Sequence, residues 1–224
     1  MTSFADLHSV LRIGRAEPKS PIGLAPKRVV DVVLALSAII ILAPLLIICF
    51  VVTIATSSGP ALFRHKRVGF NGKHFNCLKF RTMVVDAPER LRQLLEHDPA
   101  AAAEWTTTRK LRCDPRVTAI GAILRKSSLD ELPQLFNVLK GDMSIVGPRP
   151  VTDEELERYE ASISAYLACR PGITGLWQVS GRSTTTYEER VAFDTQYAQT
   201  WSMALDAKIM IVTIPSLLVT DTAC

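Results

Sequence analysis

An apolar run from Val29 to about Ala55 dominates the hydrophobic pattern, and Asp31 is the only charged residue in it. The run is about 27 residues long, whereas one transmembrane helix needs roughly 20. Hydropathy alone therefore favours a single tilted span. A secretory signal is not expected, because the run starts late and exceeds the roughly 7 to 15 apolar residues of such a signal.

Two features favour a re-entrant helix-break-helix over a full span. Pro44 lies near the centre of the run, where it removes a helix hydrogen bond, and neither half alone can cross a hydrocarbon core of about 30 Å. Positive flanks prefer the cytoplasmic side of a membrane. Basic residues flank both ends of the run: Lys27, Arg28, Arg64, Lys66 and Arg67. We expect residues 27–58 to dip into one leaflet and bend near Pro44.

Short apolar runs separated by turn residues predict a β-hairpin over residues 61–83. The turn residues are Gly69 and the pair Asn71-Gly72. Side chains that pack inward are expected at Phe75, Cys77 and Leu78. Lys79 and Arg81 alternate with Phe80, which places two cations on one face of a strand. That face is either a solvated edge or an anion-binding surface.

Helical periodicity and start signals recur through the rest of the chain. Two Thr-x-x-Glu capping boxes, at Thr152 and Thr186, each precede an amphipathic segment. Further helices are expected over residues 89–97 and 117–126. Residues 201–218 are apolar but contain Asp206 and Lys208. This segment suits either a helix lying in a membrane interface or ordinary core packing.

The central stretch, residues 123–150, combines a helix with a concentration of charge. Ser128 and Glu131 have the spacing of a capping box, and Gly141 is a typical helix stop. One buried helix face is indicated by the spacing of Leu132, Leu135, Phe136 and Leu139. Pro133 is tolerated only in the first turn of such a helix. We therefore expect the helix to begin no earlier than about Leu129.

Asp130 and Glu131 open this helix, where acidic residues often serve only to cap it. Nearby cations favour a second interpretation, because guanidinium groups recognise phosphate. The cations are Arg125, Lys126 and Arg149. Arg149 lies in a stiff Gly-Pro-Arg-Pro loop. Carboxylates beside phosphate-binding arginines suit phosphoryl transfer assisted by a metal ion.

Three glycines between Arg170 and Arg182 favour loops whose backbone amides approach a ligand. No P-loop or dinucleotide fingerprint is present in that segment. The net charge of +4 is dispersed and too mild for a nucleic-acid binder. Five cysteines and four histidines show no metal-ligand spacing, and the odd cysteine count argues against a disulfide framework.

The run SLDELPQLFNVLKGDMSIVGPRP, residues 128–150, resembles the signature of the bacterial sugar transferases, the monotopic phosphoglycosyl transferases. The resemblance extends from about Lys27 to about Leu218, with the motifs in the family's order. It implies transfer of a sugar-1-phosphate from a UDP-sugar to undecaprenyl phosphate. It also implies a re-entrant helix broken at Pro44, and Mg²⁺ as cofactor.

The resemblance further implies roles for individual residues. Asp130 would bind the metal and attack the sugar-bearing phosphorus, and Glu131 would assist the second step. Arg149 would hold the nucleotide, and Arg125 and Lys79 a phosphate. The remaining candidates for phosphate or nucleotide are Arg81, Arg170 and Arg182.

The expected fold is α/β but mostly helical, attached to one face of a membrane. The expected divisions are a flexible lead (1–26), the re-entrant helix (27–58), a catalytic domain (59–218) and a tail (219–224). The site would face the cytoplasm at a bacterial inner membrane, with the bilayer, UDP-sugar and undecaprenyl phosphate as partners and no nucleic acid. A homodimer is left open.

Two other functions compete with this one. A non-catalytic membrane adaptor of a polysaccharide assembly complex would use the basic face alone. A direct glycosyltransferase would release UDP instead of UMP. The sugar is not encoded in any motif, although galactose or glucose is favoured by analogy with the exopolysaccharide-initiating branch.

Overall fold

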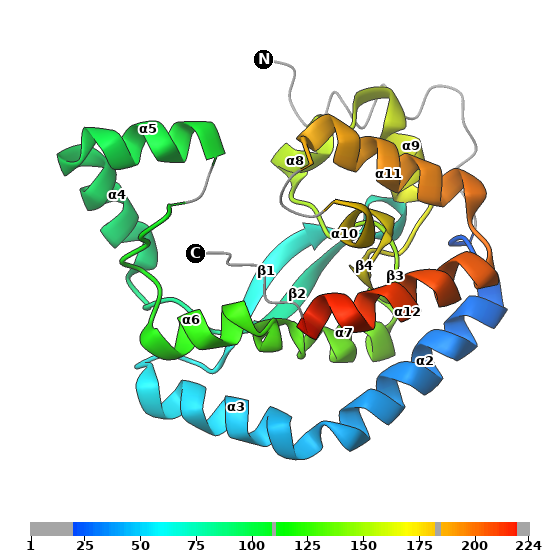
Figure 1. Ribbon diagram of the computed structural model, residues 1–224, viewed down its shortest axis with the longest axis horizontal. Coiled ribbons are helices and arrows are strands. Elements are labelled where there is room, and N and C mark those ends of the chain that lie inside the picture. The colour runs from blue at the N-terminus through cyan, green and yellow to red at the C-terminus, as the bar shows by residue number, and fades with distance from the viewer. Residues whose placement is uncertain (1–19, 109–110, 182–184, 219–224) are drawn as a thin grey trace.

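The computed structural model describes residues 20–108, 111–181 and 185–218 (Figure 1). Most of the expected lead (1–26) and the whole tail (219–224) lie outside these ranges. The helices are α2 (Leu24–Ile41), α3 (Ala43–Thr56), α4 (Ala87–His97), α5 (Pro99–Thr108), α6 (Ala119–Lys126), α7 (Gln134–Lys140), α8 (Asp153–Glu157), α9 (Ile163–Leu167), α10 (Leu176–Ser180), α11 (Tyr187–Thr200) and α12 (Met203–Leu218). Short 3-10 turns occupy η1 (Phe70–Gly72), η2 (Leu129–Glu131) and η3 (Glu160–Ser162). The fold is mostly helical, as expected.

Two small sheets complete the fold. Strands β1 (Leu62–Val68) and β2 (His74–Phe80) pair antiparallel, with Leu62 opposite Phe80. Their turn needs a left-handed backbone at Asn71 and Gly72, where φ is 56° and 75°. This confirms the predicted hairpin. Strands β3 (Ser144–Val146) and β4 (Gly172–Thr174) pair in parallel, although only loops were expected around Gly172.

Helices α2 and α3 form a bent pair along one side of the molecule (Figure 1). The bend is 67° and falls at Leu42, two residues before Pro44, which confirms the predicted break. Among the described residues, no single helix is long and apolar enough to cross a membrane, and this pair passes that test only when its two helices are taken together. Large apolar side chains on the outer surface of the pair are exposed: Val29, Val33, Ile40, Ile41, Ile47, Ile48, Val51 and Ile54.

Polar contacts attach the first half of α2 to the rest of the protein. Lys27 is only 7% exposed and donates from Nζ to Asp206 Oδ2 over 2.6 Å. Arg28 donates to the carbonyl oxygens of Val138 and Leu139 at the end of α7. Asp31 Oδ1 accepts from the backbone N–H of Ile145 over 2.9 Å. Lys27 and Arg28 are therefore internal anchors, and not the free flanking charges that the sequence suggested.

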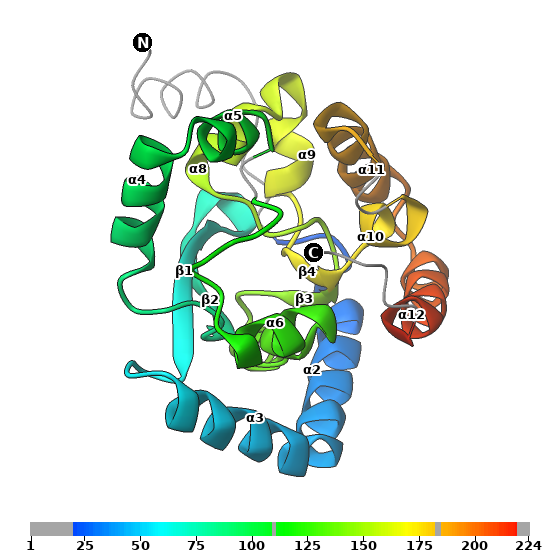
Figure 2. The same cartoon turned by 60° about the vertical axis from the view of Figure 1, so that its left-hand side comes forward.

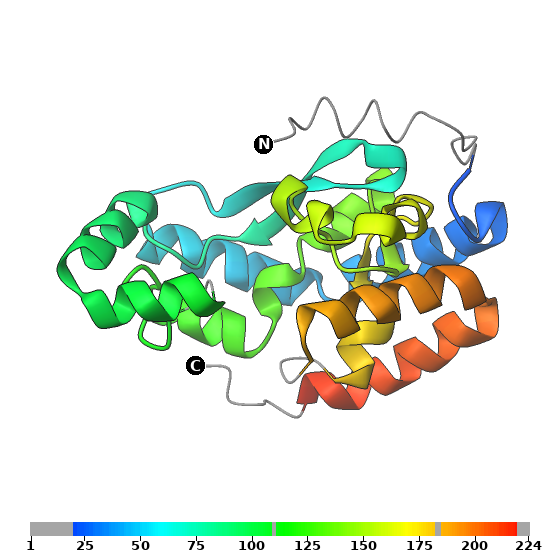
Figure 3. The same cartoon turned by 90° about the horizontal axis from the view of Figure 1, so that it is seen from above.

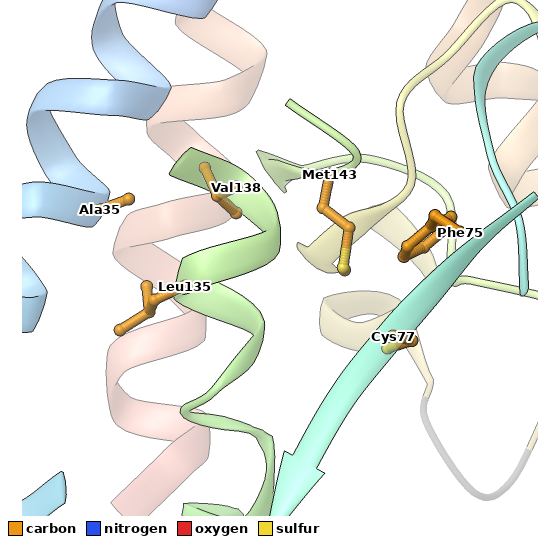
Figure 4. Close-up of a cluster of buried hydrophobic side chains, with 6 residues drawn as sticks. All are labelled: Ala35, Phe75, Cys77, Leu135, Val138 and Met143. Carbon is orange, nitrogen blue, oxygen red and sulfur yellow. The ribbon is translucent and has the colours of Figure 1, made fainter. Parts of the chain in front are cut away.

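A buried cluster joins α2, α7 and β2 behind the central stretch (Figure 4). Its members are Ala35, Phe75, Cys77, Leu135, Val138 and Met143. Val138 is fully buried, whereas Phe136 is 47% exposed. The predicted buried face of α7 is therefore wrong at Phe136, because α2 and β2 cover the side of the helix that carries Leu135 and Val138.

The remaining helices lie around this centre. Helices α4 and α5 project at one end of the molecule, away from α11 and α12 (Figure 3). Helix α10 lies between α11 and α12 (Figure 2). Ile209 of α12 is buried, whereas Ile211 and Ile214 of the same helix are more than 60% exposed. Trp201 donates its indole N–H to Asp206 over 3.0 Å, so its polar end is satisfied inside the protein.

Candidate active site

The acidic pair sits on η2, a single 3-10 turn between α6 and α7. Ser128, which precedes it, has a left-handed backbone with φ of 56° and makes no capping hydrogen bond with its side chain. The capping box predicted for Ser128 and Glu131 is therefore wrong. Pro133 is the N-cap of α7, which begins at Gln134. Because the carboxylates do not cap a helix, both are available for other contacts.

Glu131 is held by a cation from the neighbouring hairpin. Lys79 Nζ donates to Glu131 Oε1 over 2.6 Å, and both side chains are about one-third exposed (27% and 31%). Burial alone would raise the pKa of Glu131, but Lys79, Arg149 and a hydrogen bond from Gln134 outweigh it and lower that pKa. Glu131 therefore carries its charge at neutral pH.

Asp130 is more deeply placed, at 8% exposure. Burial raises its pKa to about 6, and repulsion from Glu131 adds to this, whereas Lys79 and Arg125 act in the opposite direction. Arg125 is held in place because its Nε donates to Thr82 Oγ1 over 2.8 Å. Since the pKa lies near neutrality, Asp130 is mostly an anion at pH 7 but stays weakly solvated. A raised pKa caused by burial is typical of carboxylates that take part in a reaction.

A cleft opens beside the acidic pair. It encloses about 320 Å³, part of which is open to solvent. Its walls come from both strands of the hairpin, from η2 and α7, from the loop after β3, and from β4 and α10. The lining residues are Arg67, Cys77, Lys79, Glu131, Gln134, Arg149, Pro150, Gly172, Ile173 and Gln178. Asp130 does not line the cleft itself, although its neighbour Glu131 and its electrostatic partner Lys79 do.

Backbone packing of glycines positions the loop that carries Arg149. A Cβ on Gly147 would lie 2.3 Å from the carbonyl oxygen of Arg170, and one on Gly175 would lie 2.1 Å from the carbonyl oxygen of Gly147. Contacts this close admit only glycine. Gly172 and Gly175 therefore allow the segments around β3 and β4 to touch. The approach of their backbone amides to a ligand stays a prediction.

The structure brings together four of the predicted residues and separates others. Lys79, Glu131 and Arg149 line one cleft, with Asp130 adjacent. Arg81 instead donates to the carbonyl oxygen of Pro60, and Arg170 to that of Gly141 at the end of α7. These two arginines do not line the cleft. Arg182 lies outside the described residues.

Comparison with known proteins identifies the family of this chain. The family model for bacterial sugar transferases matches residues 23–220. The chain belongs to the bacterial sugar transferase family. The exopolysaccharide production protein ExoY of Sinorhizobium fredii is 50% identical over 196 residues, which covers 88% of this chain and 87% of that protein.

Two further relatives of this sugar transferase have names that state a reaction. The undecaprenyl-phosphate galactose phosphotransferase of Salmonella typhimurium is 50% identical over 197 residues, 88% of this chain and 41% of that protein. A UDP-glucose:undecaprenyl-phosphate glucose-1-phosphate transferase of Caulobacter vibrioides is 45% identical over 223 residues, 95% of this chain and 77% of that protein.

Some residues of the transferase's cleft were not predicted as site residues. Arg67 is directly opposite Phe75 in the hairpin, so it shares a face with Cys77 and Lys79. The turn at residues 69–73 fixes this register, and a register-based prediction could have found Arg67. Trp177 and Arg190 meet beside the cleft, where Arg190 Cζ lies 4.2 Å from the indole centre. No local signal links these two residues.

A Mg²⁺ ion fits the carboxylates of this transferase only with help from a substrate. Among the described residues there is no group of three His, Cys, Asp or Glu side chains that could hold a metal. Mg²⁺ is commonly bound by one or two carboxylates together with substrate phosphates. Asp130 forms no ion pair within 4 Å in the described part of the chain, so no side-chain cation already occupies its oxygens.

Proposed function

We propose that this chain transfers a sugar-1-phosphate from a UDP-sugar to undecaprenyl phosphate, an early step of exopolysaccharide or related glycan synthesis. The names of its relatives support this choice of substrates. The observation that carries the proposal is a weakly solvated carboxylate, Asp130, adjacent to a cleft lined with cations. A diphosphate needs such cations before an anionic nucleophile can approach it.

In the first proposed step, a carboxylate oxygen of Asp130 attacks the sugar-bearing phosphorus of the donor. The bond between that phosphorus and the bridging oxygen breaks, and UMP leaves with the bonding electrons. The product is an acyl phosphate that joins Asp130 to the sugar phosphate. Arg125 and Lys79, the two cations that lower the pKa of Asp130, would stabilise the carboxylate before it attacks.

In the second step, an oxygen of undecaprenyl phosphate attacks the same phosphorus. The bond to Asp130 breaks, so the carboxylate is regenerated and the sugar is left on a lipid diphosphate. Glu131 lies next to Asp130 and keeps its charge, so it would orient the acceptor, or remove a proton when the acceptor arrives protonated.

The charges of the substrates are distributed over several groups. Arg149 lines the cleft and would hold the nucleotide. Asp130, together with the diphosphate, would hold Mg²⁺, which supplies neutralisation of phosphate charge when bound. Besides acting on Asp130, Lys79 fixes the acidic turn against the hairpin through its bond to Glu131.

The bent helix pair would attach the enzyme to one leaflet of the bacterial inner membrane. Its outward side chains are apolar and exposed, and both ends join the same body: Lys27 pairs with Asp206, and α3 leads directly into β1. A UDP-sugar is soluble in water whereas undecaprenyl phosphate stays in the bilayer, so a site at headgroup depth can reach both. We therefore place the cleft at the cytoplasmic surface.

The decisive experiment measures which nucleotide is released. Full-length protein in nanodiscs would be mixed with Mg²⁺, undecaprenyl phosphate and either UDP-galactose or UDP-glucose. UMP release that requires Asp130 supports the proposal. Release of UDP would identify a direct glycosyltransferase, and no release from either donor, or from a wider panel of UDP-sugars, would favour the adaptor.

Matched variants separate chemistry from folding. Asp130→Asn should lower turnover by about a thousandfold or more, because the amide is not a nucleophile. Asp130→Glu should be almost as inactive, because one methylene misplaces the attacking oxygen. Asp153→Asn is the control, since Asp153 pairs with His74 at the surface and should leave turnover unchanged.

A further inference from the structure

Two arginine guanidinium groups lie over the indole ring of Trp177 in α10. Arg149 Cζ lies 5.5 Å from the centre of this ring, and Arg190 Cζ lies 4.2 Å from it. Arg149 comes from the loop after β3, and Arg190 from the first turns of α11. Two like charges held against one ring repel each other unless something neutralises them.

The protein supplies little neutralisation for this pair. In the described ranges, neither Arg149 nor Arg190 forms an ion pair with a carboxylate within 4 Å. Arg190 Nε is buried and has no hydrogen-bond partner there. Burial, and then repulsion from Arg149, lower the pKa of Arg190. The aromatic rings beside Arg190 offset part of this cost, and an anion that reaches the guanidinium stabilises it further.

The two carboxylates nearest to this pair are occupied elsewhere. Glu155 accepts from Arg67 Nη1 over 2.7 Å and from the backbone N–H of Thr152. Asp194 is 1% exposed, and its Oδ2 accepts from the hydroxyl of Tyr159 over 2.7 Å. Burial raises the pKa of Asp194 to about 7, so it supplies only part of a negative charge at neutral pH. The charge deficit at Arg149 and Arg190 therefore remains.

The position of the pair argues for a water-borne anion. Arg149 lines the same cleft as Glu131 and Lys79, and its guanidinium also lies over Trp177, so Arg149 links the acidic turn to this pair. Helices α10 and α11 lie well away from α3 in both views (Figures 1 and 2). A lipid phosphate that enters beside α3 would meet Lys79 and Arg125 first. The guanidinium pair is left for the nucleotide.

We propose that Arg190 acts with Arg149, across Trp177, as a second clamp for the phosphate of the uridine nucleotide. This inference rests on the proposed function and deepens it. When the diphosphate bond breaks, negative charge develops on the phosphate of the departing UMP. Two planar guanidinium groups, already oriented by one ring, bind that phosphate and stabilise the leaving group.

The test replaces Arg190 and measures binding apart from turnover. UMP affinity would be measured by titration calorimetry on full-length protein in nanodiscs, and KM for both substrates would be measured separately. Arg190→Gln should weaken UMP binding and raise KM for the UDP-sugar by about 10- to 100-fold, because a charge-assisted bidentate contact is lost. KM for undecaprenyl phosphate should change less than about twofold. Arg190→Lys keeps the positive charge but loses the planar, bidentate guanidinium, so its UMP affinity should lie between those of the wild type and Arg190→Gln.

Arg158→Gln is the matched control. Arg158 Cζ lies 3.6 Å from the centre of the Tyr187 ring, which Arg190 also faces at 5.1 Å, but only Arg190 of the two faces Trp177. The UMP affinity of Arg158→Gln should equal that of the wild type. Unchanged UMP affinity in Arg190→Gln would overturn the clamp, as would an equal loss in Arg158→Gln. Absent UMP release in the wild-type turnover assay would refute the proposed function, whereas UMP binding that depends on Arg190 would still be measurable.

Discussion

Asp206 of α12 pairs with Lys27 of α2, and removing the Asp206 carboxylate should lower the stability of the fold. Its Oδ2 accepts from Lys27 Nζ over 2.6 Å and from Trp201 Nε1 over 3.0 Å. Its Oδ1 accepts from the hydroxyl of Tyr197 over 2.7 Å. The side chains of Lys27 and Asp206 are only 9% and 5% exposed. Asp206→Ala would therefore leave a buried ammonium group without a partner.

The expected cost follows from that burial. Breaking a buried ion pair by removing one partner destabilises a fold by about 3 to 5 kcal/mol. For a chain of this size, about 1 kcal/mol shifts Tm by about 2 to 4 °C, so Tm should fall by roughly 6 to 20 °C. The double variant Lys27→Met with Asp206→Leu should recover part of the loss, because the unpaired ammonium is removed while Trp201 Nε1 still lacks its acceptor.

Thermal unfolding of the detergent-solubilised protein provides the assay. Lys208→Ala is the control, since Lys208 is an exposed residue of the same helix and should change Tm little. The reasoning is refuted if Asp206→Ala lowers Tm no more than Lys208→Ala does. It is also refuted if the double variant is as unstable as the single variant, because the unpaired charge would then not be the cause.

Three further predictions concern the site and its support. The pKa of Asp130 is about 6, so protonation of Asp130 below that pH should reduce kcat/KM about tenfold per pH unit. A kcat/KM that stays constant down to pH 5 would exclude Asp130 as the nucleophile. The pKa of Asp194 is raised to about 7, so the stability it contributes is fully present below about pH 4 and is lost as the pH rises through about 7. Asp194→Asn should flatten that part of the stability profile, and an unchanged slope would mean that Asp194 is not its source. A Cβ on Gly147 would lie 2.3 Å from a backbone oxygen. Gly147→Ala should therefore lower the free energy of unfolding by about 1 to 3 kcal/mol, measured by denaturant unfolding. An unchanged free energy of unfolding would show that the loop shifts freely.

Structural features that depend on a few adjacent residues were predictable from the sequence. Pro44 lies in the first turn of α3, the one part of a helix that tolerates proline, and the bend lies beside it. The capping boxes at Thr152 and Thr186 depend on residues three apart, and both form. Gly141 ends α7 with a φ of 93°, a conformation that favours glycine. In each case the cause and its effect lie within one turn.

Features set by distant partners were not predictable. Lys27 and Asp206 are 179 residues apart, and nothing local to Lys27 distinguishes a buried anchor from a flanking charge. Ser128 and Glu131 have the spacing of a capping box, but Glu131 pairs instead with Lys79 of strand β2. Phe136 follows the helical pattern of its neighbours, yet α2 and β2 cover another face of α7. Arg190 reaches the site only because α10 and α11 are in contact.

The covalent step at Asp130 is the central claim, and trapping the intermediate tests it most directly. Full-length protein would be incubated with Mg²⁺ and a UDP-sugar in the absence of undecaprenyl phosphate, quenched, digested and analysed by mass spectrometry. We predict a sugar-phosphate adduct on the peptide that contains Asp130, absent in Asp130→Asn and lost when undecaprenyl phosphate is added before quenching. Full conversion of the lipid acceptor with no adduct at any time, or an adduct on another residue, would contradict the claim.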